Sequence, residues 1–234
     1  MSEHTHKQFD AEMEAIRSGV LAMGGLVETQ LARAIALLGD EDEEGAVDQV
    51  GAAEHQINQM QMTIDQQCSQ IIAKRQPAAI DLRMILVVVK IVNELERLGD
   101  EIKKIAYKAH EMLRPERLTA VRLHEITRAA ELAERNLQLA LDAFARLDVN
   151  AAATVIVNDE AIDAAFLAIL RQLISYMMED PRTITPALEI VFIAKSIERI
   201  GDHAKNIAEN VVHAVKGKDV RHATAEQIRA EVAE

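Results

Sequence analysis

Two pairs of acidic residues recur with the same spacing in the two halves of the chain. Glu96 and Asp100 are four residues apart, and so are Glu198 and Asp202. On an α-helix, residues four apart lie one turn apart on the same face, so each pair sets two carboxylates side by side. Like charges at this spacing repel each other and call for a cation, which can be a metal ion or a basic side chain.

An ordinary salt-bridged surface would also explain these pairs. Lys103 lies three residues beyond Asp100, and Lys205 lies three residues beyond Asp202. Each lysine can neutralise the aspartate one turn before it on the same helix. The residue pattern alone leaves this alternative open beside a metal site.

A second polar pair faces each carboxylate pair if consecutive helices form hairpins. Residues equidistant from the turn of an antiparallel hairpin lie level with each other, and prolines mark the turns near 77 and 181. Oxygen ligands of this kind suit Mg²⁺, Mn²⁺, Ca²⁺ or iron. The candidate metal ligands are Glu54, Asn58, Glu96 and Asp100 in the first half, and Asp159, Asp163, Glu198 and Asp202 in the second half.

The elements that position these residues are predicted to be long helices. Aromatic residues make up only 3% of the chain and there are four prolines, whereas residues with high helix propensity dominate. Hydrophobic periodicity between the proline and glycine breaks gives the expected helices. They cover 5–38, 43–76, 79–113, 116–147, 151–180 and 184–215.

An internal repeat decides the expected architecture. Residues 96–106 align with 198–208 at an offset of 102 residues, with seven of eleven positions identical, and 54–58 align with 159–163 at an offset of 105. The sequence therefore predicts an all-α fold of two tandem three-helix bundles. The expected domains are residues 1–114, residues 115–218 and a C-terminal tail of 219–234.

Composition excludes several classes of function. The chain has 26 basic and 38 acidic residues and a net charge of −12, which argues against nucleic-acid binding. Its single cysteine excludes an intramolecular disulfide framework. No secretory signal is evident, and the longest apolar run falls well short of a membrane span of about 20 residues. These features predict a cytoplasmic protein.

Two further residues and one segment have side chains that could take part in chemistry. His203 follows Asp202, and we expect it to be a solvent-facing histidine and not a ligand. Cys68 lies among isoleucines and is expected to be a buried apolar residue rather than a nucleophile. The segment 75–83 packs four charged residues around Pro77, and Arg83 in it is free to bind an anion.

The helical periodicity also places the acidic pairs relative to the core. An apolar stripe that includes Leu95, Leu98 and Ile102 lies on the opposite side of its helix from Glu96 and Asp100. The clusters are therefore expected at the surface. This differs from ferritin-like di-iron proteins, whose ligands lie inside a four-helix bundle.

The chain resembles the PhoU family of phosphate-specific transport system accessory proteins. The resemblance covers about 9–222, and the duplicated Glu-Arg-Leu/Ile-Gly-Asp motif is its most specific part. The other matching strings lie at 9–12, 23–25, 75–83 and 217–222, together with Glu28.

This resemblance implies a regulator and not an enzyme. PhoU-like proteins restrain phosphate uptake and repress the phosphate-starvation response, and they link the ATPase subunit of the phosphate ABC transporter to a phosphate-sensing histidine kinase. The family also implies homodimers, contact with the inner membrane only through partners, and iron, zinc, manganese or magnesium at the paired acidic motifs. Asn58 departs from the carboxylate pattern, so the first-half site is expected to differ from the second.

Two other functions remain open on the residues alone. A metal-dependent enzyme acting on phosphate compounds would need open metal positions and an organised nucleophile. A purely structural helical bundle would use its acids only for solvation.

Overall fold

The chain folds into six long α-helices, as the periodicity predicts. The computed structural model describes residues 2–38, 45–112, 124–221 and 227. The helices are α1 (Ser2–Leu38), α2 (Ala46–Arg75), α3 (Ile80–Met112), α4 (His124–Arg146), α5 (Val149–Glu179) and α6 (Ile184–Lys216), and a short 3₁₀ helix, η1 (Pro181–Thr183), precedes α6. The predicted start of the fourth helix at 116 lies outside the described residues.

Local chemistry explains where the helices begin and end. The carboxylate of Asp148 accepts hydrogen bonds from the backbone N–H groups of Asn150 and Ala151, which caps the start of α5. Gln76 takes a left-handed conformation at the end of α2, immediately before Pro77. Gly217, with a φ of 73°, ends α6 in the left-handed region that glycine tolerates best.

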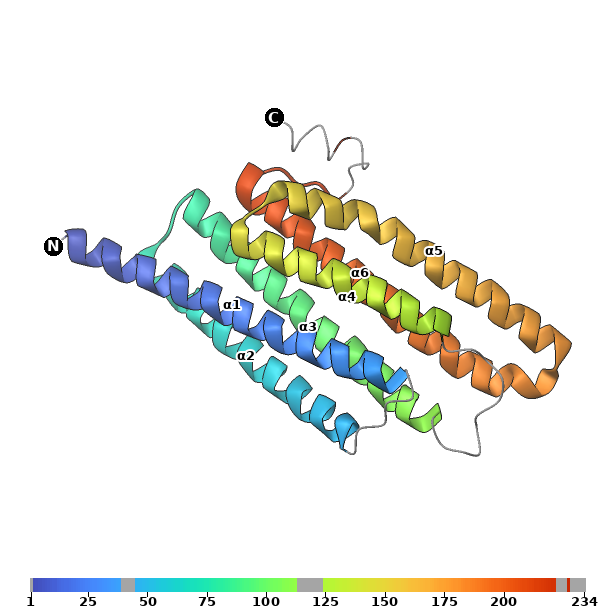
Figure 1. Cartoon of the computed structure of the whole chain (residues 1–234). Helices are drawn as coiled ribbons and strands as arrows, with labels where there is room; N and C mark the ends of the chain where they lie inside the picture. Colours follow the sequence, from blue (N-terminus) through green and yellow to red (C-terminus); the bar gives the residue numbers. More distant parts are fainter. Residues whose placement is uncertain (1, 39–44, 113–123, 222–226, 228–234) are drawn as a thin grey trace.

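Two three-helix bundles lie side by side. Helices α1, α2 and α3 form one bundle and α4, α5 and α6 form the other, with α3 packed along α6 where the bundles meet (Figure 1). Helix α1 also contacts α4. Buried apolar residues from all six helices form one continuous core, so the two repeats are joined through their interior.

Helix α1 is more apolar than the longest uninterrupted apolar run of the sequence suggests. By length and composition alone, Lys7–Leu38 could cross a membrane, with a mean hydropathy of 1.3 and 44% of the window buried. A buried core helix passes the same test, and α1 packs against α2, α3 and α4 in this fold. Its apolar composition therefore has a sufficient explanation in the core.

Candidate functional site

The first acidic cluster spans the α2–α3 hairpin. Helix α2 carries Glu54 and Asn58, and helix α3 carries Glu96 and Asp100. The Asn58 Nδ2 group donates to Glu54 Oε1 over 2.9 Å. Burial raises the pKa of Glu96, and the negative charges of Asp100 and Glu54 raise it further. The structure thus brings together the residues that hairpin geometry paired, and their role as ligands stays a prediction.

Lys103 pairs differently from the way the sequence suggested. Its Nζ lies 3.0 Å from Glu54 Oε2 across the hairpin. The bond to Asp100 on the same helix, which the sequence left open, is therefore not its main contact, although the charge of Asp100 still raises the pKa of Lys103 after the larger effect of Glu54. A lysine side chain is long enough to reach the neighbouring helix, and the helical spacing rule does not anticipate this.

The second cluster repeats this arrangement on the α5–α6 hairpin. Burial raises the pKa of Asp202, and the negative charges of Glu198, Asp159 and Asp163 raise it further. The pKa of Asp163 is also raised, by burial and then by Asp159 and Glu198. The four carboxylates that the sequence placed together are therefore within electrostatic reach of one another.

Two lysines neutralise part of this second cluster. Lys205 Nζ lies 2.9 Å from Asp159 Oδ2, the position equivalent to Glu54. Lys195 Nζ lies 2.6 Å from both carboxylate oxygens of Glu198. As in the first half, the lysine bonds across the hairpin to Asp159, and not to Asp202 as the alternative of a salt-bridged surface would have it.

The glycine of each Glu-Arg-Leu/Ile-Gly-Asp motif lets the two helices of the hairpin approach closely. A Cβ atom at Gly99 would lie 3.2 Å from Ile57 Cδ1. A Cβ atom at Gly201 would lie 2.9 Å from Ile162 Cδ1 and 3.1 Å from Asp159 Oδ1. The motif therefore places a carboxylate beside a point of tight helix packing, which holds the facing acids in position.

The chemistry of the donor set fits a hard cation. Asp159 is only 1% exposed, which corrects the expectation of wholly surface-exposed clusters, and its Oδ1 has no hydrogen-bond partner among the described residues. The Oδ1 of Asn58 is likewise buried without such a partner in the described part of the chain. An oxygen in this state gains a partner if a cation binds.

The present side-chain positions are not those of a closed metal site. Within the described ranges, no group of three or more His, Cys, Asp or Glu side chains is arranged so that it could hold a metal ion. The lysine bonds contribute to this, because they occupy oxygens that a metal would need. A bound ion therefore requires rotation of side chains within the clusters.

A polar network between the two halves was missed by sequence reasoning. His203 is 9% exposed, and its Nδ1 lies 2.7 Å from Glu94 Oε2, so the expectation of a solvent-facing histidine was wrong. On the same helix pair, Ser196 Oγ and Arg199 Nη1 donate to Glu101 over 2.8 and 2.9 Å. Glu94 and Glu101 carry no distinctive spacing, so only the packing of α3 on α6 reveals them.

An open cleft of about 430 Å³ adjoins the second cluster. Every residue that lines it is polar or charged, and Asp202 and Lys205 are among them. Cluster residues of the second half are thus reachable from solvent. The other lining residues are Arg199, His203, Asn206, Glu209 and Arg221.

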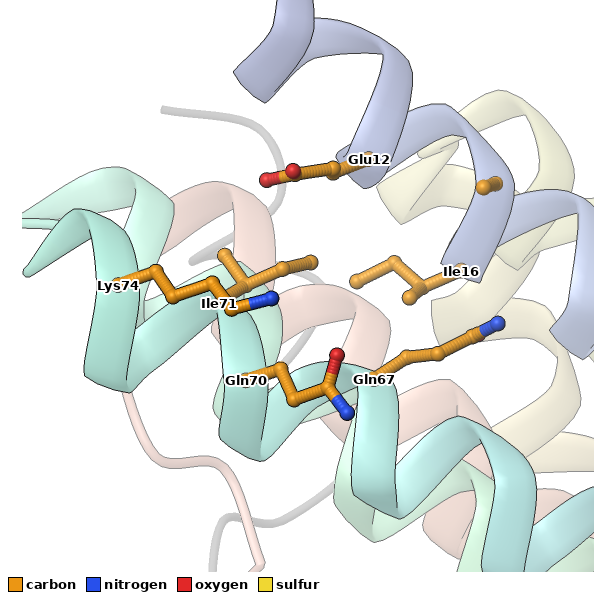
Figure 2. A pocket seen from close by; sticks show the side chains of 7 residues that line it. Glu12, Ile16, Gln67, Gln70, Ile71 and Lys74 are labelled. Carbon is orange, nitrogen blue, oxygen red and sulfur yellow. The ribbon is translucent and has the colours of Figure 1, made fainter.

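A smaller pocket of about 120 Å³ lies between α1 and α2, away from both clusters (Figure 2). Ile16 and Ile71 approach each other across it, with Gln67 and Lys74 on the α2 side. Glu12 on the α1 side is bonded through both oxygens to Arg75, at 2.9 and 3.0 Å. Arg75 from the 75–83 segment therefore serves to tie α2 to α1.

Arg83 from the same segment has a structural contact. Its guanidinium packs against the backbone of Gly217 at the end of α6, and its Nε is buried without a hydrogen-bond partner in the described residues. A cation is favourable at the C-terminal end of a helix, where the backbone carbonyls point. The charge of Arg83 thus lies at a favourable position, and the anion site that the sequence left open stays a prediction.

Comparison with known proteins agrees with this architecture. A family model described as the PhoU domain matches residues 20–109 and 126–211, so it occurs twice. The phosphate-specific transport system accessory protein PhoU homolog of Pseudomonas aeruginosa is 44% identical over 232 residues, covering 99% of this chain and 95% of the relative. The Escherichia coli (strain K12) accessory protein PhoU is 40% identical over 231 residues, with 97% and 93% covered.

Solved structures show the same fold. The crystal structure of PhoU from Pseudomonas aeruginosa has a TM-score of 0.86 and 45% identity, and the match covers 90% of this chain and all of the other. The phosphate transport system regulatory protein PhoU from Streptococcus pneumoniae has a TM-score of 0.81 at 27% identity, with 91% and 99% covered. The agreement extends over both bundles.

Proposed function

Because the chain belongs to the PhoU family, we propose that it is a regulatory accessory protein of a phosphate-specific transport system. The observation that carries this proposal is similarity along nearly the whole chain to relatives named for that role, at 40–44% identity. In the finer form of the proposal, the protein restrains phosphate uptake and represses the phosphate-starvation response. It does so in the cytoplasm, by linking the ATPase subunit of the transporter to a sensor histidine kinase.

The proposed action is binding and not catalysis. The relatives are named as accessory and regulatory proteins. Cys68, the single cysteine of the chain, is buried, and burial followed by the charge of Asp65 raises its pKa to about 11. A thiol with this pKa is almost wholly protonated at neutral pH and is a poor nucleophile.

The two acidic clusters are proposed as sites for metal ions. Glu54, Asn58, Glu96 and Asp100 would hold an ion in the first half, and Asp159, Asp163, Glu198 and Asp202 would hold one in the second half. The oxygen donors favour magnesium, manganese or iron over a metal that prefers sulfur, and zinc remains compatible with carboxylates. A bound ion would neutralise the carboxylates and link α2 to α3 and α5 to α6.

Partners would meet a charged surface. The net charge of −12 disfavours direct adsorption to anionic lipid, so association with the inner membrane is proposed to depend on the transporter. We further propose that the protein acts as a homodimer, as the family resemblance implies.

The partner proposal is tested by measuring binding of the purified protein to the transporter ATPase subunit and to the sensor kinase. Binding of both, and constitutive expression of phosphate-starvation genes when the chain is deleted, is the expected result. Failure of the wild-type protein to bind either partner would overturn the linking role.

The metal proposal is tested by elemental analysis of wild type beside an Asp100→Ala/Asp202→Ala variant. We expect metal in the wild type and its loss in the variant. A matched control is Glu131→Ala/Asp142→Ala, which removes two exposed acids outside the clusters. Equal metal content in all three proteins would place the metal elsewhere.

A further inference from the structure

Equivalent lysines bind equivalent carboxylates in the two halves. Lys103 and Lys205 are 102 residues apart, which is the offset of the repeated motif. Each crosses its hairpin to the residue that opens the facing polar pair, with Nζ–oxygen distances of 3.0 Å to Glu54 and 2.9 Å to Asp159. This lysine–carboxylate bond is therefore a feature that both clusters have in common.

The two clusters differ at two further positions, and the differences compensate. Asp163 in the second half corresponds to Asn58 in the first, and Lys195 corresponds to Asn93 at the motif offset. Lys195 bonds to both oxygens of Glu198, whereas Asn93 accepts a hydrogen bond from Gln61 over 2.7 Å. The extra negative charge thus comes with an extra positive charge.

When only the bonded lysines are counted, both clusters carry the same formal net charge. Three carboxylates and Lys103 leave −2 in the first half, and four carboxylates with Lys195 and Lys205 leave −2 in the second half. One divalent cation neutralises either remainder. The balance holds although the clusters differ in composition.

We propose that Lys103 and Lys205 act as internal counterions that leave their carboxylates when a divalent cation binds, and that they thereby lower the affinity of each cluster for the cation. This inference rests on the metal sites of the proposed function and adds the residues that control them.

Competition follows from which oxygens are already bonded. Glu54 has one oxygen bonded to Lys103 and the other to Asn58. A cation that binds the Oε2 atom of Glu54 must therefore displace the ammonium group of Lys103. Asp159 has one oxygen bonded to Lys205 and one buried oxygen without a hydrogen-bond partner in the described chain. The Oδ1 atom of Asp159 is thus available to a cation before Lys205 moves.

The lysines have room to leave. The side chains of Lys103 and Lys205 are 40% and 35% exposed, so each ammonium group can rotate into water. Lys205 and Asp202 also line the same polar cleft. Solvent in this cleft thus reaches both Lys205 and Asp202.

Manganese(II) titration of metal-free protein tests this inference. We expect Lys103→Met and Lys205→Met each to raise the affinity of one of two Mn²⁺ sites about tenfold, since removal of one nearby positive charge is worth at least this much at partly exposed positions. The double variant should strengthen both sites. Lys205→Arg, which keeps the charge, should bind as wild type or more weakly.

Lys104→Met is the matched control. Lys104 is 52% exposed, lies next to Lys103 and bonds to Glu101 outside the clusters. Its replacement should leave Mn²⁺ affinity unchanged. Circular dichroism melting of every variant confirms that the helices have formed.

The possible failures are distinguishable. Mn²⁺ binding in the wild type, with equal or weaker binding in both cluster methionine variants, would overturn the counterion role and leave the metal proposal standing. Absence of Mn²⁺ binding in all of these proteins would overturn both. An equal rise in Lys104→Met would show a general charge effect and would also overturn the inference.

Discussion

The imidazole Nδ1 of His203 in α6 lies 2.7 Å from the carboxylate of Glu94 in α3, and this contact joins the two halves of the chain. Its counterpart is the 2.8 Å hydrogen bond from Ser196 to Glu101. Ser196 stands 102 residues after Glu94, and His203 stands 102 residues after Glu101. The two contacts therefore join the same two positions of the repeat. In one contact the first half supplies the earlier position, and in the other it supplies the later position.

Removal of Glu94 should weaken the junction between the bundles. Burial raises the pKa of this carboxyl, but hydrogen bonds from His203 and Asn206 outweigh burial and bring its pKa below the ordinary value. Glu94→Ala leaves both donors without this acceptor, so we expect urea unfolding to show a loss of about 1–3 kcal/mol. Glu131→Ala, at an exposed pair with Arg135, should cost less than about 1 kcal/mol. Equal losses would contradict the role of this contact.

Substitution of Gly217 should be costly for two separate reasons. Its φ of 73° disfavours a side chain, and an added Cβ would collide with the guanidinium of Arg83. We expect Gly217→Ala to lower the free energy of unfolding by about 1–2 kcal/mol. Gly25→Ala is the opposite control, because Gly25 lies within α1 with open space around its Cα and gains about 1 kcal/mol of helix propensity. Chemical denaturation of both variants should therefore give changes of opposite sign.

The two motif glycines should differ in how strongly they tolerate alanine. A Cβ at Gly201 meets both Ile162 and Asp159 at 3.1 Å or less, whereas a Cβ at Gly99 meets the flexible end of Ile57 at 3.2 Å. Gly201→Ala is expected to cost about 1–3 kcal/mol by overpacking, more than Gly99→Ala. Because it also pushes on Asp159, it should weaken Mn²⁺ binding in the second half only. Calorimetric titration checks the second statement, and two equally weakened sites would contradict it.

The metal-free protein should respond to pH through Asp202. A carboxyl whose pKa is raised by folding binds its proton more tightly in the folded state. It therefore adds stability below its unfolded pKa of about 4, and this stability is lost as pH rises through the folded pKa. In the presence of a chelator, Asp202→Asn should melt above wild type at pH 7 by roughly 2–4 °C, the shift for about 1 kcal/mol in a protein of this size. The difference should disappear at acid pH below both pKa values.

Glu131→Gln serves as the control for this pH dependence. Glu131 is an exposed glutamate on α4, 3.8 Å from Arg135. Its substitution should change the melting temperature little at any pH. A gain in Asp202→Asn that persists unchanged into acid would show that its cause is not the raised pKa of Asp202, which follows from burial and then from the neighbouring carboxylates.

Local rules explain how much of the fold could be predicted from the sequence. The turn at Pro77 sets the register of α2 against α3, so position along the chain alone placed Glu54 and Asn58 opposite Glu96 and Asp100. Where the described residues allow the comparison, helix ends shifted by only a few residues, as with 184–215 against the observed Ile184–Lys216. The prolines and glycines that mark these ends act on their own backbone and are visible in the sequence.

Contacts that depend on packing between bundles could not be predicted in the same way. The interaction of Glu94 with His203 requires the antiparallel contact of α3 with α6, which no turn specifies. The same holds for the bonding partner of Lys103, because its long side chain can reach either Asp100 or Glu54. Helical spacing favoured Asp100, but the structure has Glu54 as its bonded partner. The depth of each cluster depends on this packing, and so does the burial of Asp159.

The exchanged contacts between α3 and α6 also bear on the origin of the chain. An interface in which residue i of one unit meets residue j of the other, and j meets i, is isologous, the relationship found in a twofold dimer. A single three-helix unit could therefore pair with its own copy through this helix. Fusion of two such units would free the paired positions to differ, as Glu101 and His203 now do. The polar junction between the halves can thus be regarded as a dimer interface retained within one polypeptide.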